Sequence, residues 1–175
     1  MSGISTKMLQ AAAGAGGEVV GWINLVGKSG YADSGRGTAV DSADNIIVVG
    51  NSLGLLIAKY NSLGILQWAR DLNGASSDGA RGVAIDSSDN IIVVGETLSE
   101  GAGAFDSLVA KYNSSGVLQW QKILGGANSE FGNAVAIDSS DNIIVAGITA
   151  SDGAGSNDFL IAKYNSSGTL QWDRT

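Results

Sequence analysis

The sequence predicts an all-β protein, and three observations support this fold class. The chain of 175 residues contains 26 glycines and no proline, and it is rich in Val, Ile, Leu, Ser, Asn and Asp. Such a composition is typical of short strands joined by polar turns. One twelve-residue stretch occurs three times almost unchanged, and the four tryptophans follow the same period.

The repeated stretch reads AVDSADNIIVVG at residues 39–50, AIDSSDNIIVVG at 84–95 and AIDSSDNIIVAG at 136–147. The tryptophans lie 46, 52 and 52 residues apart, at Trp22, Trp68, Trp120 and Trp172. The first interval is shorter because the segment after residue 50 lacks seven residues that the later copies contain. Length variation confined to one segment indicates a surface loop on a fixed scaffold.

Each copy is expected to form four strands, which in the middle copy cover residues 81–87, 90–96, 107–112 and 117–124. Asp and Ser favour a tight turn between the first two strands, and we expect Asn90 to adopt the left-handed conformation that closes it. The second strand begins with an unbroken apolar run, which indicates burial on both faces. The fourth strand mixes polar and apolar residues, as an edge strand does.

Units of about fifty residues with four antiparallel strands match the blades of a β-propeller. The predicted fold is therefore propeller-like, with three four-stranded antiparallel repeats and one extra N-terminal strand at residues 17–27. A β-trefoil and a β-prism remain alternatives, because each closes with three units of four strands. The trefoil unit is usually shorter, nearer 40 residues.

The pattern GVAIDSSDNIIVVG, followed by AKYNSSGVLQW, resembles the SBBP-type β-propeller repeat, which is close to NHL-type blades. The resemblance spans roughly residues 35–175. The sequence departs from it at Asp44, Asp89 and Asp141, where the family usually has Gly. The resemblance implies a bacterial surface or secreted protein whose blades share no catalytic residues.

The chain divides into an N-terminal tail or anchor segment at residues 1–16 and a β-repeat domain at 17–175, with units of about 17–68, 69–120 and 121–175. The opening residues ISTKMLQAAAGAGG are similar to the start of phage virion structural proteins. They contain no apolar stretch long enough for a signal peptide. We therefore expect a virion or extracellular-surface location without a recognisable signal peptide.

Three blades do not close a ring, since propellers use four to eight. Exposed end blades would leave apolar surface in water, so we expect a homo-oligomer, with the dimer and its six blades favoured. The strand at residues 17–27 corresponds to the fourth strand of a preceding blade. It would add to another chain's last blade or replace the final strand of that blade.

Several chemistries are excluded by composition. The chain has no cysteine and no histidine, which removes thiolate chemistry, sulfur-bound metal centres and a Ser-His-Asp triad. A net charge of -7 without a basic patch argues against binding nucleic acid or anionic membranes. Nearly identical units carry no asymmetric site, so we expect neither an enzyme nor a bound cofactor.

The candidate ligand contacts are the repeated tryptophans Trp68, Trp120 and Trp172, whose indole faces can stack on a pyranose ring. Packing between neighbouring units is the alternative and the favoured interpretation. Asp106 and Asp158 close the long loops 99–106 and 151–158, which are candidate Ca²⁺ sites because carboxylates are hard oxygen ligands. The Asp clusters in the repeated turns are better explained by turn formation, and each lysine before a tyrosine is expected to pair with an adjacent unit or reach solvent.

The sequence therefore favours a non-enzymatic structural or binding module. Nearly identical units suit a surface that binds its partner through several copies of the same site. We expect a tail-fibre, spike or decoration protein of a phage particle, or a cell-surface protein, that binds itself and virion proteins. A multivalent lectin that binds cell-surface glycans is the alternative.

Overall fold

The computed structural model describes residues 5–9, 23–27, 32–52, 54–72, 77–102, 104–153 and 156–175. These residues form strands and turns and contain no helix long and apolar enough to cross a membrane. Twelve strands form three four-stranded sheets, here called the first, second and third blades. They are β3 (Ser34–Val40), β4 (Ile46–Asn51), β5 (Leu55–Tyr60) and β6 (Leu66–Leu72); β7 (Asp78–Ile85), β8 (Ile91–Thr97), β9 (Asp106–Tyr112) and β10 (Leu118–Leu124); and β11 (Glu130–Ile137), β12 (Ile143–Thr149), β13 (Asp158–Tyr164) and β14 (Leu170–Arg174).

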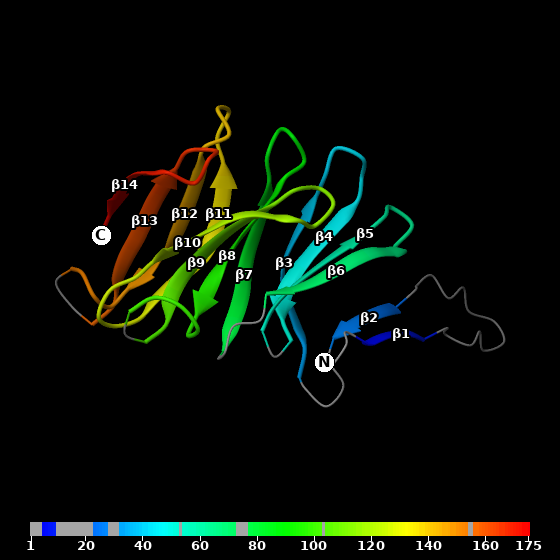
Figure 1. Ribbon diagram of the computed structural model, residues 1–175, viewed down its shortest axis with the longest axis horizontal. Coiled ribbons are helices and arrows are strands. Elements are labelled where there is room, and N and C mark those ends of the chain that lie inside the picture. The colour runs from blue at the N-terminus through cyan, green and yellow to red at the C-terminus, as the bar shows by residue number, and fades with distance from the viewer. Residues whose placement is uncertain are drawn as a thin grey trace, which may run out of the picture.

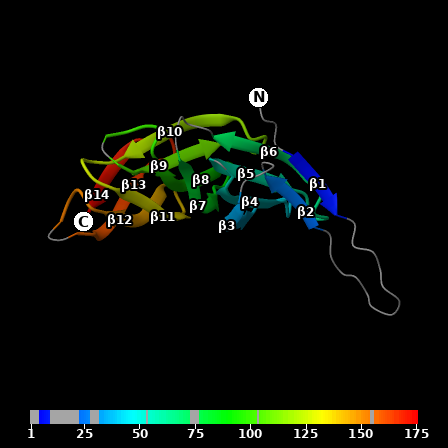
Figure 2. The same cartoon turned by 90° about the horizontal axis from the view of Figure 1, so that it is seen from below.

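Every blade is an antiparallel meander in chain order, with its first and fourth strands at the two edges. The predicted all-β, propeller-like class is confirmed, and the strands expected in the middle copy agree with β7 to β10 to within three residues. The three blades lie side by side in chain order, with the second blade between the first and the third (Figure 1), and the turned view shows the same order (Figure 2).

The core consists of two layers, one on each side of the second blade. Apolar side chains of β4 and β5 pack against one face of the second blade, and those of β12 and β13 pack against the other. Every residue of β8 and β9 is consequently buried. This burial on both faces is what the unbroken apolar run predicted. In β12 of the third blade, buried and half-buried residues alternate instead.

Extensive packing joins the first blade to the second and the second to the third. A trefoil or a prism would seal three units around one centre, and the described residues have a linear succession of blades instead. Twist between successive sheets turns that succession into an arc. The fold is therefore a section of a propeller.

One expectation about the turns is wrong. In the turn between the first and second strands, Asp89 adopts the left-handed conformation, with a φ of 59°, while Asn90 does not. Asp44 and Asp141 have φ values of 60° and 58°. Asn90 instead donates from its side-chain amide to both carboxylate oxygens of Asp86, at 3.1 and 2.9 Å. The aspartates thus occupy the position where a glycine is the least strained residue.

The N-terminal segment contributes a separate two-stranded sheet. β1 (Ser5–Leu9) pairs antiparallel with β2 (Ile23–Gly27). β1 lies within the predicted tail, and β2 covers the end of the predicted extra strand, whose first part and Trp22 lie outside the described residues. In both views the hairpin lies on the side of the first blade (Figures 1 and 2).

Candidate functional site

The two ends of the blades differ in their loops. At one end, called here the short-turn end, each blade has two tight turns, one between its first two strands and one between its last two. At the other end, called the long-loop end, the loops between the second and third strands join β8 to β9 and β12 to β13. Buried carboxylates gather at the long-loop end, at the start of β7 and β11, near the end of β8 and at the start of β9: Asp78, Glu130, Glu96 and Asp106.

Two of these buried acids occupy equivalent positions in successive blades. Asp78 accepts hydrogen bonds from the Thr97 and Ser99 hydroxyls at 2.5 and 3.0 Å. In the next blade, Glu130 accepts from the Thr149 hydroxyl at 3.0 Å and from the backbone N–H of Gly126 at 2.6 Å. Both carboxylates therefore bind the start of a first strand to neighbouring loop residues.

The surroundings of the Glu130 carboxyl favour its ionised form. Burial by itself would raise the pKa of Glu130, but the hydrogen bonds from Ser151, Thr149 and Gly126 outweigh burial and lower the pKa. Because its oxygens already accept several hydrogen bonds, this carboxylate is a structural group that holds the adjacent loop.

Asp106 differs from these two acids. Its side chain is only 1% exposed, and its Oδ1 atom has no hydrogen-bond partner. Burial, followed by the nearby charge of Glu130, raises the pKa of Asp106. Gly101 and Gly125 lie against this carboxylate, since an added β-carbon would lie 2.0 and 1.5 Å from its oxygens. A ligand could reach the carboxylate only after these residues moved. The equivalent Asp158 is half-buried and precedes the exposed Phe159.

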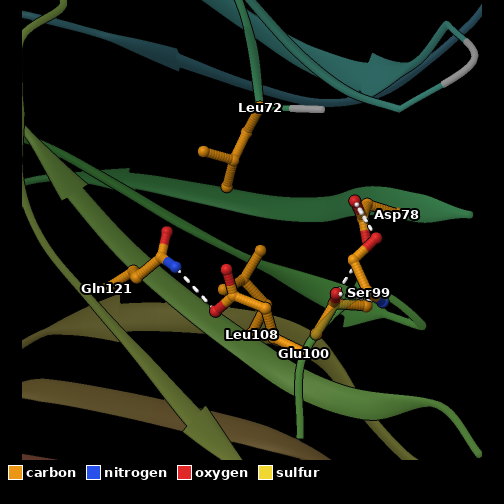
Figure 3. Close-up of a pocket in the computed structure, with 7 residues that line it drawn as sticks. Leu72, Asp78, Ser99, Glu100, Leu108 and Gln121 are labelled. Atoms are coloured by element: carbon orange, nitrogen blue, oxygen red, sulfur yellow. Dashed lines mark hydrogen bonds between the residues drawn. The ribbon is translucent and has the colours of Figure 1, made fainter. Parts of the chain in front are cut away.

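Two pockets lie between the first and second blades at the long-loop end, and Asp78 lines both. The smaller pocket holds about 50 Å³, room for a few water molecules. Figure 3 shows Leu72 of the first blade opposite Asp78, Glu100 and Gln121, with the Gln121 amide donating to Glu100 at 2.8 Å. The larger pocket has a volume of about 310 Å³, enough for a small ligand. Its lining consists of Asn51, Gly54, Ser77, Asp78, Glu96 and Phe105.

The larger pocket combines a phenyl ring with amide and carboxylate groups. Glu96 forms an ion pair with Arg81 at 2.5 Å, and the Arg81 guanidinium lies over the Phe131 ring at 4.8 Å. Phe131 in turn lies 5.4 Å from Phe105. This arrangement can hold a small polar ligand with one apolar face. Within the described parts of the chain, no group of three or more acidic, His or Cys side chains could hold a metal ion.

Sequence reasoning missed this pocket. The signal lay in the places where the copies differ, since Glu96 stands where the other copies have Asn51 and Ile148. Ligand-binding residues in a repeat protein are more often found where one copy departs from the others, because a single pocket is asymmetric.

The short-turn end holds a repeated ion pair. Lys59 lies 2.7 Å from Asp41, and Lys111 lies 2.8 Å from Asp86. The lysines were expected to pair with an adjacent unit or reach solvent, but each one pairs with the turn aspartate of its own blade. Lys59 and Lys111 also donate to the backbone carbonyls of Ser114 and Ser166, each at 3.2 Å, and so contact the next blade.

The turn aspartates are satisfied without a metal. Asp41 accepts hydrogen bonds from the backbone N–H groups of Ala43 and Asn45 and from the Asn45 amide. Burial tends to raise the pKa of Asp41, but Lys59 and then Asn45 outweigh burial and lower the pKa to about 2. Hydrogen bonds within the turn and the ion pair with Lys59 together occupy both oxygens of this carboxylate.

Acidification is expected to destabilise the protein through these carboxylates. A carboxyl whose pKa is lower in the folded state contributes stability above its unfolded pKa, which is about 3.9. That contribution is lost as the pH falls through the folded value, which for Asp41 is about 2. The urea midpoint, followed by tryptophan fluorescence, should therefore fall between about pH 5 and pH 2. An unchanged midpoint over this range would contradict the assignment.

The candidate tryptophans lie at the contacts between blades. Trp68 donates from its indole N–H to the Ser114 carbonyl at 3.3 Å, and its ring lies against Gly116 of the second blade. Trp120 lies against Gly168 of the third blade in the same way. Trp172 of the third blade is 36% exposed, with the Arg174 guanidinium 5.8 Å from its ring. Trp68 and Trp120 thus occupy the inter-unit packing position, and Trp172 has an accessible ring.

The fold and this arrangement of blades define a β-propeller-like repeat protein. Residues 139–170 match the family model described as a domain of unknown function (DUF5122) β-propeller. A solved structure, described as a protein of unknown function from Bacteroides caccae, is similar with a TM-score of 0.55 at 12% identity. The similarity covers 90% of this chain and 50% of that one, so the chain spans half the length of its structural neighbour. No curated protein matches the sequence.

Proposed function

We propose that this chain is a non-enzymatic structural or binding module that works as a homo-oligomer. The observation that carries the proposal is the uneven burial of equivalent apolar positions. In the second blade Ile91, Ile92, Val93 and Val94 are completely buried. In the outer blades, by contrast, the equivalents of these residues on the outward faces, Ile46, Val48, Ile144 and Ala146, are only half-buried. Val40, the equivalent of the half-buried Ile85, is 57% exposed. Exposed apolar sheet faces mark contact surfaces for other proteins.

The chemistry at the long-loop end supports a non-enzymatic role. Asp78 and Glu130 already accept hydrogen bonds from hydroxyl and N–H groups. A nucleophile paired with a free general base is the usual signature of acyl or glycosyl transfer. The hydroxyl–carboxylate pairs among the described residues, such as Ser99–Asp78 and Ser42–Asp89, join loops and neighbouring blades, and the whole chain contains no histidine.

We place the module at the surface of a phage particle or a cell. The similarity of the opening residues to virion structural proteins and the near-identity of the repeats both support this location. Mass spectrometry of purified particles of the source virus should detect the chain as a particle component. Recovery of the chain only in host cytosol would contradict the location.

The oligomeric part of the proposal predicts the native mass. Light scattering should give about twice the chain mass of 17.7 kDa, because two copies supply six blades. The measurement should be made over a range of protein concentrations to expose dissociation. A stable species of single-chain mass throughout the range would remove the oligomeric role.

A multivalent glycan-binding lectin is the second candidate, and the larger pocket favours it. Phe105 offers a flat apolar face beside the amide of Asn51 and the carboxylates of Asp78 and Glu96, which is the combination that binds a sugar ring. A glycan array should show binding that the Phe105→Ala variant reduces about tenfold or more. Val117→Ala is the control, since Val117 of the second blade is 54% exposed and does not line this pocket. An array without signal, in the presence and absence of Ca²⁺, would contradict this role.

A further inference from the structure

The contact between neighbouring blades contains a hydrogen-bonded pair that occurs twice. The backbone N–H and hydroxyl of Ser42 donate to the Asp89 carboxylate of the second blade, at 2.9 and 2.6 Å. Ser87 donates in the same way to Asp141 of the third blade, at 3.0 and 2.6 Å. Each blade thus supplies a serine to the blade that follows and an aspartate to the blade that precedes.

The outer blades retain one unmatched member of this pair each. Ser139 is the equivalent of Ser42 and Ser87, and Asp44 is the equivalent of Asp89 and Asp141. Among the described residues, no blade follows Ser139 and no serine donates to Asp44, which is exposed. Asp44 nevertheless keeps the left-handed backbone, at a φ of 60°, which a glycine would adopt with less strain.

The outward face of the third blade is equivalent to the surface that the second blade buries against its neighbour, except that the exposed Phe159 stands where the second blade has the buried Ser107. The buried residues Ile92, Val94 and Val109 of the second blade correspond to Ile144, Ala146 and Ile161 of the third, which are only half-buried. The ion pair on this face is also more exposed. The side chains of Lys163 and Asp138 are 27% and 30% exposed, against 10% and 3% for Lys111 and Asp86.

The outward face of the first blade is complementary to that surface. Val83 and Ile85 of the second blade pack against the core between the first and second blades. In the same way, Val135 and Ile137 of the third blade pack against the core between the second and third blades. The corresponding residues of the first blade, Thr38 and Val40, are exposed. The first blade therefore offers the surface that each blade presents to its predecessor.

We propose that two copies of this chain join head to tail, with the third blade of each copy packed against the first blade of the other. Ser139 of one copy then donates to Asp44 of the other, and the Lys163 ammonium reaches the Ser62 carbonyl of the other copy. This inference rests on the proposed oligomer and specifies its interface. The contact repeats the two interfaces within the chain, and two such contacts close a six-bladed ring.

A cross-linking experiment tests the pairing, because the natural chain has no cysteine. Ser139→Cys and Asp44→Cys are made in separate full-length chains, and a short bis-maleimide is added to each chain alone and to their mixture. Only the mixture should give a covalent dimer. Ser140→Cys mixed with Asp44→Cys is the matched control, and its yield should be several-fold lower.

A charge exchange gives a second measurement that does not depend on cross-linker reach. Ser139→Asp places a carboxylate opposite Asp44 and should raise the dissociation constant of the dimer ~10-fold or more. Combining it with Asp44→Ser should restore dimerisation, because the pair is present again in reversed order. The dimer is measured by sedimentation at several protein concentrations.

The outcomes separate this inference from the proposed oligomer. Cross-linking of either single variant with itself would indicate a symmetric face-to-face contact and overturn the head-to-tail pairing. A wild-type oligomer that neither cross-links in the mixture nor responds to Ser139→Asp would overturn it too, while leaving the oligomer intact. A monomeric wild-type protein would refute both proposals.

Discussion

Replacing Gly95 with alanine is expected to lower the free energy of unfolding by about 3 kcal/mol or more. A β-carbon at this position would lie 1.8 Å from the carbonyl oxygen of Gly79, and a backbone atom cannot move aside as a flexible side chain can. The clash occurs at a β-bulge, where β7 shifts register between Ala80 and Gly82. The other blades repeat it at Gly50 and Gly147, with distances of 1.8 and 1.9 Å.

The repeat supplies a matched control for this substitution. Gly35 is the equivalent of Ala80, so Gly35→Ala installs the residue that the second blade already has. Its β-carbon would lie 3.6 Å from Val48, an ordinary contact. Urea unfolding followed by circular dichroism should show a large loss for Gly95→Ala and little change for Gly35→Ala. Equal stability of the two variants would refute the close-approach argument.

Replacing Lys111 with methionine is expected to cost about 3 kcal/mol, because it leaves the Asp86 carboxylate buried without its cation. The Lys111 and Asp86 side chains are only 10% and 3% exposed, and Nζ lies 2.8 Å from Oδ2. The substitution also removes the hydrogen bond from Lys111 to the Ser166 carbonyl, which links the second blade to the third. Calorimetry or urea unfolding at neutral pH measures the loss.

Two further observations separate the buried charge from lost packing. Adding Asp86→Asn to Lys111→Met should restore part of the stability, because the uncompensated charge is gone.

Burial is the largest influence on the pKa of Asp86 and raises it, and Lys111 is the largest opposing influence. Without Lys111 the folded pKa of Asp86 should be higher than in the wild-type protein, because its largest lowering influence is gone. The single variant should then lose less stability relative to wild type as the pH falls towards 4, where about half of an unperturbed Asp is already protonated. A loss independent of pH, with no rescue, would indicate that packing alone is responsible.

The repeat made most of the fold predictable. Similar segments favour the same local structure, so the four-stranded unit followed from one copy, whereas β1 lies within the segment that was expected to be a tail. The double-sided burial of β8 followed from its apolar run. Turn details were less accessible, since Asp and Asn both tolerate a left-handed backbone and only hydrogen bonding distinguishes Asp89 from Asn90.

The candidate site was less predictable. The tryptophans were recognised as possible inter-unit or ligand residues, and the structure brings Trp68 and Trp120 against the next blade. Glu96, Phe105 and Asn51 were not singled out, because they come together only when two blades stand side by side. Asp106 was singled out, but nothing in a single strand indicates that its carboxylate would be 1% exposed.

By itself, the sequence determined the twelve strands of the three units and their order, because period, apolar pattern and turn residues are local properties of the chain. The tertiary structure decided which copy of each residue is buried and which is exposed. Ile92 and Ile144 have the same neighbours in sequence, yet only Ile92 has a blade packed over it in the described structure. Burial depends on what lies across the sheet face, and that is set by the position of a unit in the assembly.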